Sequence, residues 1–162
     1  MSPSSSSFSA APRKALRFVP VIAAVWLVAP GTAHADVRLG LGADYWAEMP
    51  RAGFADLTLA VDGYIARNLQ VGGRFGALVT MYPNTFGVPL DLLLRANLGH
   101  VYLEGLVGPW IFMEPYWQSY AALFHFHGAF GFGLQSGGLL FGVEVGWLDP
   151  WPHAGLRLGF RI

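Results

Sequence analysis

The sequence has no cysteine and little charge. Of its 162 residues 12% are charged, and the ten basic side chains equal the ten acidic ones in number. Without cysteine, disulfides, thiol nucleophiles, thiolate metal sites and lipid-modified cysteines are all excluded. The balanced charge argues against a nucleic-acid-binding protein, because there is no excess of basic residues to neutralise phosphates.

Lysine is almost missing as well, and its one occurrence lies in a segment typical of a secretory signal. Basic residues, Lys14 among them, precede an apolar run over residues 18–29, and a small-x-small site ends at Ala35. This order predicts a signal peptide over residues 1–35, cleaved near Ala35, and a mature chain over residues 36–162. The alternative, a membrane anchor, is disfavoured because a spanning helix needs about 20 apolar residues.

Long hydrophobic runs are missing from residues 36–162, although 54% of the whole chain is hydrophobic. The apolar residues instead alternate with polar ones or glycine at a period of two, which is typical of β-strands with two different faces. Turn-type residues divide the pattern into segments that begin near Val37, Leu57, Leu69, Val88, Val101, Phe124, Leu139 and Ala154. The sequence therefore predicts eight strands.

One face of these strands is apolar, and the other carries glycine and most of the charge. A soluble lipocalin-type barrel and an outer-membrane barrel both produce this alternation, with opposite faces inward. The polar face has no lysine and many glycines, as expected inside a narrow barrel rather than on a surface in water. We expect an all-β fold, an eight-stranded antiparallel up-and-down transmembrane β-barrel over residues 36–162.

Charged residues of opposite sign recur at similar distances from three of the expected turns. Residues equidistant from a hairpin turn face each other across the strands, and buried charges need partners. This symmetry predicts an interior salt-bridge layer in which three pairs form: Asp62 with Arg74, Arg95 with Glu104, and Glu144 with Arg157.

The expected connections alternate between short turns and longer loops, as in membrane barrels whose short turns are periplasmic. The short ones lie around Asn68, at Gly99–His100 and at Ser136–Gly137, whereas Leu148–Pro152 is one of the longer ones. Aromatic residues crowd the ends near the longer loops, where an interfacial girdle is expected: Tyr45, Trp46, Tyr82, Trp110, Tyr116, Trp117, Tyr120, Trp147 and Trp151.

The signal, the strand count, the topology and the charged interior together resemble the small eight-stranded outer-membrane barrels, such as the OmpA membrane domain and OmpX. The resemblance implies a bacterial outer-membrane location among lipid and lipopolysaccharide. Residues 154–162, with Phe160 and Ile162 at their end, resemble the C-terminal signal read by the barrel-assembly machinery. We expect a monomer with no cofactor and no nucleic-acid partner.

The expected role is structural or surface-interacting, with a closed ionic interior and no catalysis. One alternative is a lipid A-modifying enzyme, since barrels similar to this one include deacylases and palmitoyltransferases that use a serine with histidine and an acid. Its candidate groups are His125, His127 and Glu144, but the serines of the mature chain, Ser119 and Ser136, lie beside neither histidine. A second alternative is a narrow ion-conducting pore, disfavoured because side chains fill an eight-stranded barrel.

Two polar groups suggest weaker candidate sites. His125 and His127 share a face with Glu144 nearby, a spacing that suits a metal, although interior hydrogen bonding is the preferred interpretation. Asp44, Glu48 and Asp56 lie near the expected outer rim and offer oxygens for a cation, although a hydrated rim is preferred. The sequence therefore assigns neither a metal site nor a catalytic site.

Overall fold

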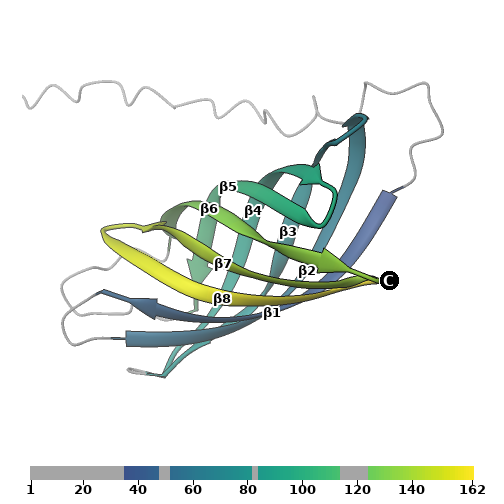
Figure 1. Ribbon diagram of the computed structural model, residues 1–162. Helices are drawn as coiled ribbons and strands as arrows, with labels where there is room; N and C mark the ends of the chain where they lie inside the picture. The colour runs from purple at the N-terminus through teal and green to yellow at the C-terminus, as the bar shows by residue number, and fades with distance from the viewer. Residues whose placement is uncertain (1–34, 48–51, 82–83, 114–123) are drawn as a thin grey trace, which may run out of the picture. The chain divides into compact units, whose positions relative to one another are not determined.

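The computed structural model describes residues 35–47, 52–81, 84–113 and 124–162, so most of the predicted signal peptide lies outside the described residues. Eight strands form a closed barrel in which each is antiparallel to its neighbours and the last pairs with the first (Figure 1). The expected eight-stranded antiparallel barrel is confirmed. The strands are β1 (Ala35–Trp46), β2 (Ala52–Ala66), β3 (Leu69–Thr80), β4 (Phe86–Leu98), β5 (Val101–Phe112), β6 (Phe124–Ser136), β7 (Leu139–Leu148) and β8 (Trp151–Arg161).

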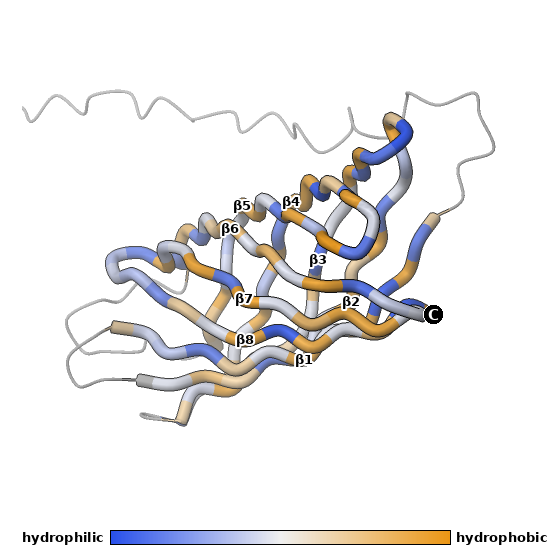
Figure 2. Tube along the Cα trace, viewed as in Figure 1, coloured by the Kyte–Doolittle hydropathy of each residue, from blue (hydrophilic) through white to orange (hydrophobic). Residues whose placement is uncertain are grey.

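The period of two separates an apolar exterior from a polar interior, because successive side chains of a strand point to opposite faces. Outward-facing residues such as Leu92 and Phe126 are about 60% exposed, whereas inward-facing Arg95 and His127 are fully buried. Figure 2 shows this alternation as hydrophobic and hydrophilic positions that follow one another along the strands. No helix of membrane-crossing length and hydropathy occurs among the described residues.

Tight turns close one end of the barrel, which we call the turn end; the opposite end is the loop end. The turn end holds Arg67–Asn68, Gly99–His100 and Gly137–Gly138. Gly99, Gly137 and Gly138 have φ of 73°, 57° and 90°, positive values that are typical of tight hairpin turns. At the loop end β7 and β8 are joined by Asp149 and Pro150 alone, so the expected longer loop over Leu148–Pro152 is wrong.

The strand register corrects one of the three expected charge pairs. Asp62 lies opposite Gly72 and forms its ion pair with Arg38. Arg74 lies opposite Ala60 and pairs with Asp91 and Glu144, so the predicted Asp62–Arg74 pair does not form. The two-residue turn and a bulge between Tyr64 and Ala66 move the centre of this hairpin toward β2, away from Asn68. Symmetry about Asn68 therefore assigned the wrong partners.

The other two predicted pairs form. Arg95 lies directly opposite Glu104. Glu144 lies opposite Gly155, two residues from Arg157, because the turn between their strands is shorter than expected. Arg157 nevertheless reaches Glu144 diagonally with its long side chain.

An aromatic plug fills the loop end of the barrel. Each of its members is at most 1% exposed, namely Trp46, Phe54, Leu78, Trp110, Phe112 and Leu148. Trp46 and Trp110 were expected in the lipid-facing girdle, and this expectation is wrong because both occupy inward positions of the alternation. Tyr45 and Trp147 are about half exposed outside, and Trp151 packs against the plug. The remaining girdle candidates, Tyr82, Tyr116, Trp117 and Tyr120, lie outside the described residues.

Candidate functional site

Ion pairs fill the interior below the aromatic plug. The larger group, here the Glu144 cluster, consists of Asp44, Asp56, Arg74, Asp91, Glu144 and Arg157. Its centre is Glu144, whose carboxylate accepts a 2.7 Å hydrogen bond from Arg74 Nη1 and a 2.8 Å one from Arg157 Nη2. Arg74 Nη2 also donates to Asp91 Oδ2 at 2.8 Å. The cluster thus binds β3, β4, β7 and β8 together through charged side chains.

A second group, here the Glu104 cluster, lies nearer the turn end and consists of Arg38, Asp62, Arg95 and Glu104. Arg38 forms an ion pair with Asp62, and both Arg38 Nη1 and Arg95 Nη1 donate to Glu104 Oε1 at 2.7 Å. The Arg95 guanidinium also lies 4.0 Å from the ring centroid of Tyr102, a cation–π distance. The positive and negative charges of this cluster are equal in number.

Several of these contacts cross the lumen. Arg38 on β1 reaches Glu104 on β5, and Arg74 on β3 reaches Glu144 on β7, so each pair joins strands on opposite sides of the eight-stranded ring. Burying such charges costs several kcal/mol per ion, which only multiple well-placed partners offset. The crossing pairs brace opposite walls and occupy the space that a channel would need.

A small cavity of about 50 Å³ remains among these side chains. Its lining includes Arg38, Arg74, Tyr102, Glu104 and Arg157. A space of this size admits water and excludes a solute.

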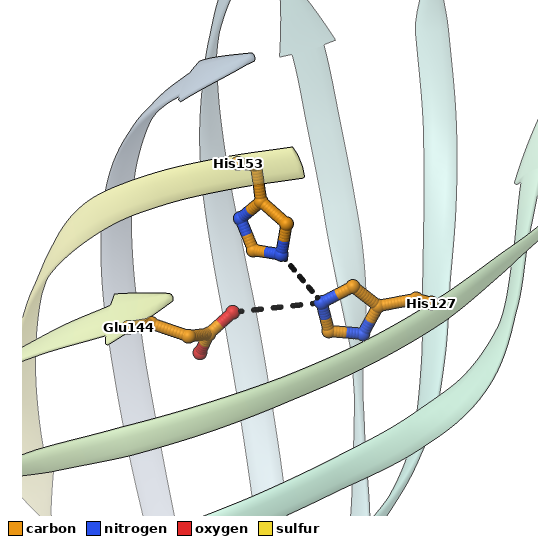
Figure 3. A group of neighbouring side chains, drawn as sticks. All are labelled: His127, Glu144 and His153. Carbon is orange, nitrogen blue, oxygen red and sulfur yellow. Dashed lines mark hydrogen bonds and ion pairs between the residues drawn. The ribbon is translucent and has the colours of Figure 1, made fainter. Parts of the chain in front are cut away.

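Two histidines, His127 on β6 and His153 on β8, meet beside Glu144. Their Nε2 atoms lie 3.1 Å apart, and His127 Nε2 lies 3.7 Å from Glu144 Oε1 (Figure 3). The other ring nitrogen of each histidine faces a carboxylate: His127 Nδ1 lies 2.7 Å from Asp91 Oδ1, and His153 Nδ1 lies 3.2 Å from Asp44 Oδ1. All three side chains converge from adjacent strands.

His153 was not among the residues singled out from the sequence. The alternation of the last strand, extended back from Arg157 and Gly155, places His153 on the inward face, and this signal was available. It was overlooked because the longer turn expected up to Pro152 placed position 153 at the very start of the strand.

His125 does not join His127, although both point inward. Its ring lies against the aromatic plug, 5.1 Å from Phe112 between centroids, and its Nδ1 is 2.6 Å from the carbonyl oxygen of Asp149. The pairing of His125 with His127 suggested by their spacing is therefore wrong, and the partner of His127 comes from β8.

The acidic group near the loop end is arranged around a guanidinium. Asp44 forms an ion pair with Arg157, and Asp56 Oδ2 lies 3.5 Å from Arg157 Nη1. Asp44 lies opposite Phe54, and Asp56 lies opposite Gly42. Glu48 lies outside the described residues.

The described serine is far from the histidines. Ser136 ends β6 at the turn end and is exposed, whereas His125 and His127 lie at the other end of the same strand. Ser119 lies outside the described residues. Among the described residues no serine contacts a histidine, so this part of the chain contains no serine–histidine pair for acyl transfer.

No family model and no curated protein matches the sequence. Solved structures do match, among them two de novo designed barrels. A chain from "De novo design of transmembrane beta-barrels" has a TM-score of 0.59 and 9% identity, covering 78% of this chain and 95% of that one. The designed barrel TMB2.3, solved by solution NMR, has a TM-score of 0.51 and 14% identity, covering 79% and 94%.

The fold is that of a transmembrane β-barrel. At such low identity the likeness concerns the fold alone. It agrees with the apolar exterior and the charged interior, which together suit a barrel embedded in a membrane.

Proposed function

We propose that this chain is an integral outer-membrane β-barrel protein with a structural or surface-interaction role and a closed, ionic interior. The observation that carries the proposal is the filled lumen, in which crossing ion pairs lie below a plug of buried aromatic side chains. In a barrel filled in this way, function rests on the rigid wall and the outer loops and not on transport through the lumen.

The proposed location is the bacterial outer membrane, after removal of residues 1–35. The exposed apolar exterior supports a lipid and lipopolysaccharide environment, and residues 154–162 form most of the closing strand that the barrel-assembly machinery would recognise. Cells that express the full chain should yield a protein that begins at Asp36, fractionates with the outer membrane and migrates differently on gels before and after boiling. Recovery from the soluble periplasmic fraction without detergent would contradict this location.

Conductance tests the closed interior. The purified protein in planar bilayers should show no discrete openings, because ion pairs and the plug occupy the lumen. Trp46→Ala with Trp110→Ala, which opens the plug while leaving the ion pairs, provides the matched variant for detecting a residual path. Stable single-channel steps from the unaltered protein would instead support the pore alternative.

Lipid chemistry and cell-surface behaviour separate the structural role from the enzyme alternative. Deletion of the gene or the change His127→Ala should leave the lipid A mass spectrum unchanged. Replacing residues 114–123 by a short glycine-serine linker should alter adhesion of the cells without preventing membrane insertion. A changed acylation pattern in the deletion strain would support the lipid A-modifying alternative, and unchanged adhesion would count against a surface role.

A further inference from the structure

His127 and His153, the two buried histidines beside Glu144, form hydrogen bonds that leave their Nε2 atoms unprotonated when the rings are neutral. A neutral imidazole carries one N–H, and the nitrogen beside a carboxylate is the one that donates. His127 Nδ1 faces Asp91, and His153 Nδ1 faces Asp44. Both Nε2 atoms then direct lone pairs at each other across 3.1 Å. Two such lone pairs repel unless a positive charge lies between them.

We propose that His127, His153 and Glu144 bind one divalent transition-metal ion, with zinc as the best-fitting metal. Their donor atoms lie within 4.8 Å of one another, and Figure 3 shows His153 and Glu144 both facing the same ring nitrogen of His127. Nitrogens about 2.0–2.1 Å from a tetrahedral zinc are about 3.3 Å apart, close to the separation of the two Nε2 atoms. Glu144 Oε1 lies 3.7 Å from His127 Nε2 and, because all three donor atoms lie within 4.8 Å of one another, supplies a third ligand once its side chain moves toward the two histidines.

Each histidine has a carboxylate beside its Nδ1, which is the arrangement usual for metal-binding histidines. A ligating imidazole generally donates its other N–H to a carboxylate, which fixes the ring and makes it a stronger ligand. Asp91 performs this role for His127 and is itself fixed by Arg74 and by Trp110 Nε1 at 3.2 Å. Asp44 performs it for His153 and is held by Arg157.

The local charge also favours a cation. The Glu104 cluster is balanced, whereas the Glu144 cluster has two arginines against four carboxylates, an excess of two negative charges. Uncompensated charge is costly in a buried site, and a divalent ion removes this excess at the point where the histidines meet. Protonation of both histidines would also balance the two negative charges, so the experiment must distinguish metal binding from protonation.

The neighbouring guanidinium groups restrict the choice of ion. Arg74 and Arg157 hydrogen-bond both oxygens of Glu144, which leaves this carboxylate able to offer a metal one ligand, far fewer than the about 6–8 oxygen ligands of Ca²⁺. Imidazole nitrogens suit zinc, cobalt, nickel and copper instead. His127, Glu144 and His153 are at most 4% exposed, so the ion would be structural. It would join β6, β7 and β8, next to the seam where β8 pairs with β1.

Metal titration of the intact barrel tests the site. The protein is isolated from membranes in detergent with an affinity tag that contains no histidine, stripped with a chelator, and titrated with Co²⁺ and then Zn²⁺. We expect one Co²⁺ per chain, visible absorption bands of a low-coordinate site, displacement by Zn²⁺, and no competition from Ca²⁺. Acidification should weaken binding, because protons compete for the imidazole nitrogens.

Three histidine variants provide matched controls. His127→Gln and His153→Gln should abolish stoichiometric binding, whereas His125→Gln, which changes an inward histidine outside the site, should retain it. Asp91→Asn should lower the affinity about 10–100-fold while preserving one site per chain. The gel shift between unboiled and boiled samples checks that each variant is folded.

The proposal is overturned if the folded, unaltered barrel binds less than one equivalent of Co²⁺ or Zn²⁺, or if His127→Gln, His153→Gln and His125→Gln bind alike. Should the site variants fail to fold, X-ray absorption of the zinc-loaded unaltered protein decides the question. A first shell with two imidazole nitrogens supports the site, and a shell of oxygens alone contradicts it. Neither result bears on whether the barrel resides in the outer membrane.

Discussion

At the scale of single residues, Glu144 is the centre of the larger group of buried ion pairs. It is 1% exposed, accepts hydrogen bonds from Arg74 and Arg157, and lies beside His127. A buried carboxylate with two guanidinium partners contributes through its network rather than through one pair. Its removal leaves two buried positive charges with fewer partners.

Glu144→Ala should lower the free energy of unfolding by about 3–5 kcal/mol, because Arg74 and Arg157 each lose a buried ion pair. Arg161→Ala is the matched control: the Arg161 side chain is 40% exposed and pairs with Asp36 at 2.9 Å. Removing that rim pair should cost about 1 kcal/mol or less. Urea unfolding in lipid vesicles, followed by tryptophan fluorescence, measures both changes. Equal losses of stability in the two variants would show that the buried Glu144 cluster stabilises the barrel no more than the exposed rim pair does.

Gly146 shows how closely the barrel interior is packed. A Cβ at this position would lie 2.6 Å from Ala129 Cβ and 2.7 Å from His153 Nε2, whereas a Cβ at Gly105 would meet nothing within 4 Å. Gly146→Ala should therefore destabilise the barrel by about 1–3 kcal/mol, through overpacking. Gly105→Ala should change its stability by no more than about 0.5 kcal/mol. Equilibrium unfolding of the two variants tests this difference, and two unchanged stabilities would contradict it.

At the scale of elements, each hairpin turn sets which inward side chains face one another. The Gly99–His100 turn has two residues, as expected, whereas the β6–β7 turn lies at Gly137–Gly138, one residue beyond the expected Ser136–Gly137. The β2–β3 hairpin adds a bulge near Ile65, and the β7–β8 turn is shorter than its sequence suggests. The bulge and the shorter turn each change which residue lies opposite the charged side chains of their hairpin.

The stability cost of replacing a turn glycine should depend on its backbone conformation. Gly137 has φ of 57°, in the left-handed region. Gly137→Val should cost about 1–2 kcal/mol and slow insertion into vesicles, whereas Gly137→Asn should cost less, because asparagine adopts this conformation more readily. The gel shift of folded protein over time and urea unfolding provide the two measurements. A valine variant as stable as the asparagine variant would contradict the role of the turn.

At the scale of the whole molecule, a lipid-facing exterior surrounds a charged interior. Leu92 at the middle of β4 is 61% exposed, and Leu98 at its turn-end terminus is 56% exposed. In a soluble barrel both positions would face water and tolerate charge equally. In a membrane the cost of charge depends on depth.

Leu92→Arg should therefore destabilise the barrel by about 2–4 kcal/mol, and Leu98→Arg by about 0–1 kcal/mol, when unfolding is measured in lipid bilayers. The same two variants in detergent should differ less, because a micelle adapts to a charge. Equal costs in bilayers would mean that β4 does not span the membrane at the depth its length indicates.

The sequence by itself determined the strand count, the two faces and the inward location of most charged residues, because side-chain direction in a strand follows from the period of two. The tertiary structure decided which of those charges meet. Arg38 contacts Glu104 across 66 positions of the chain, and Arg157 contacts Asp44 across 113. Such partners depend on barrel closure and on the register of every hairpin between them. For the same reason the contact of His127 with His153 emerged only when β8 was placed beside β7 and β1.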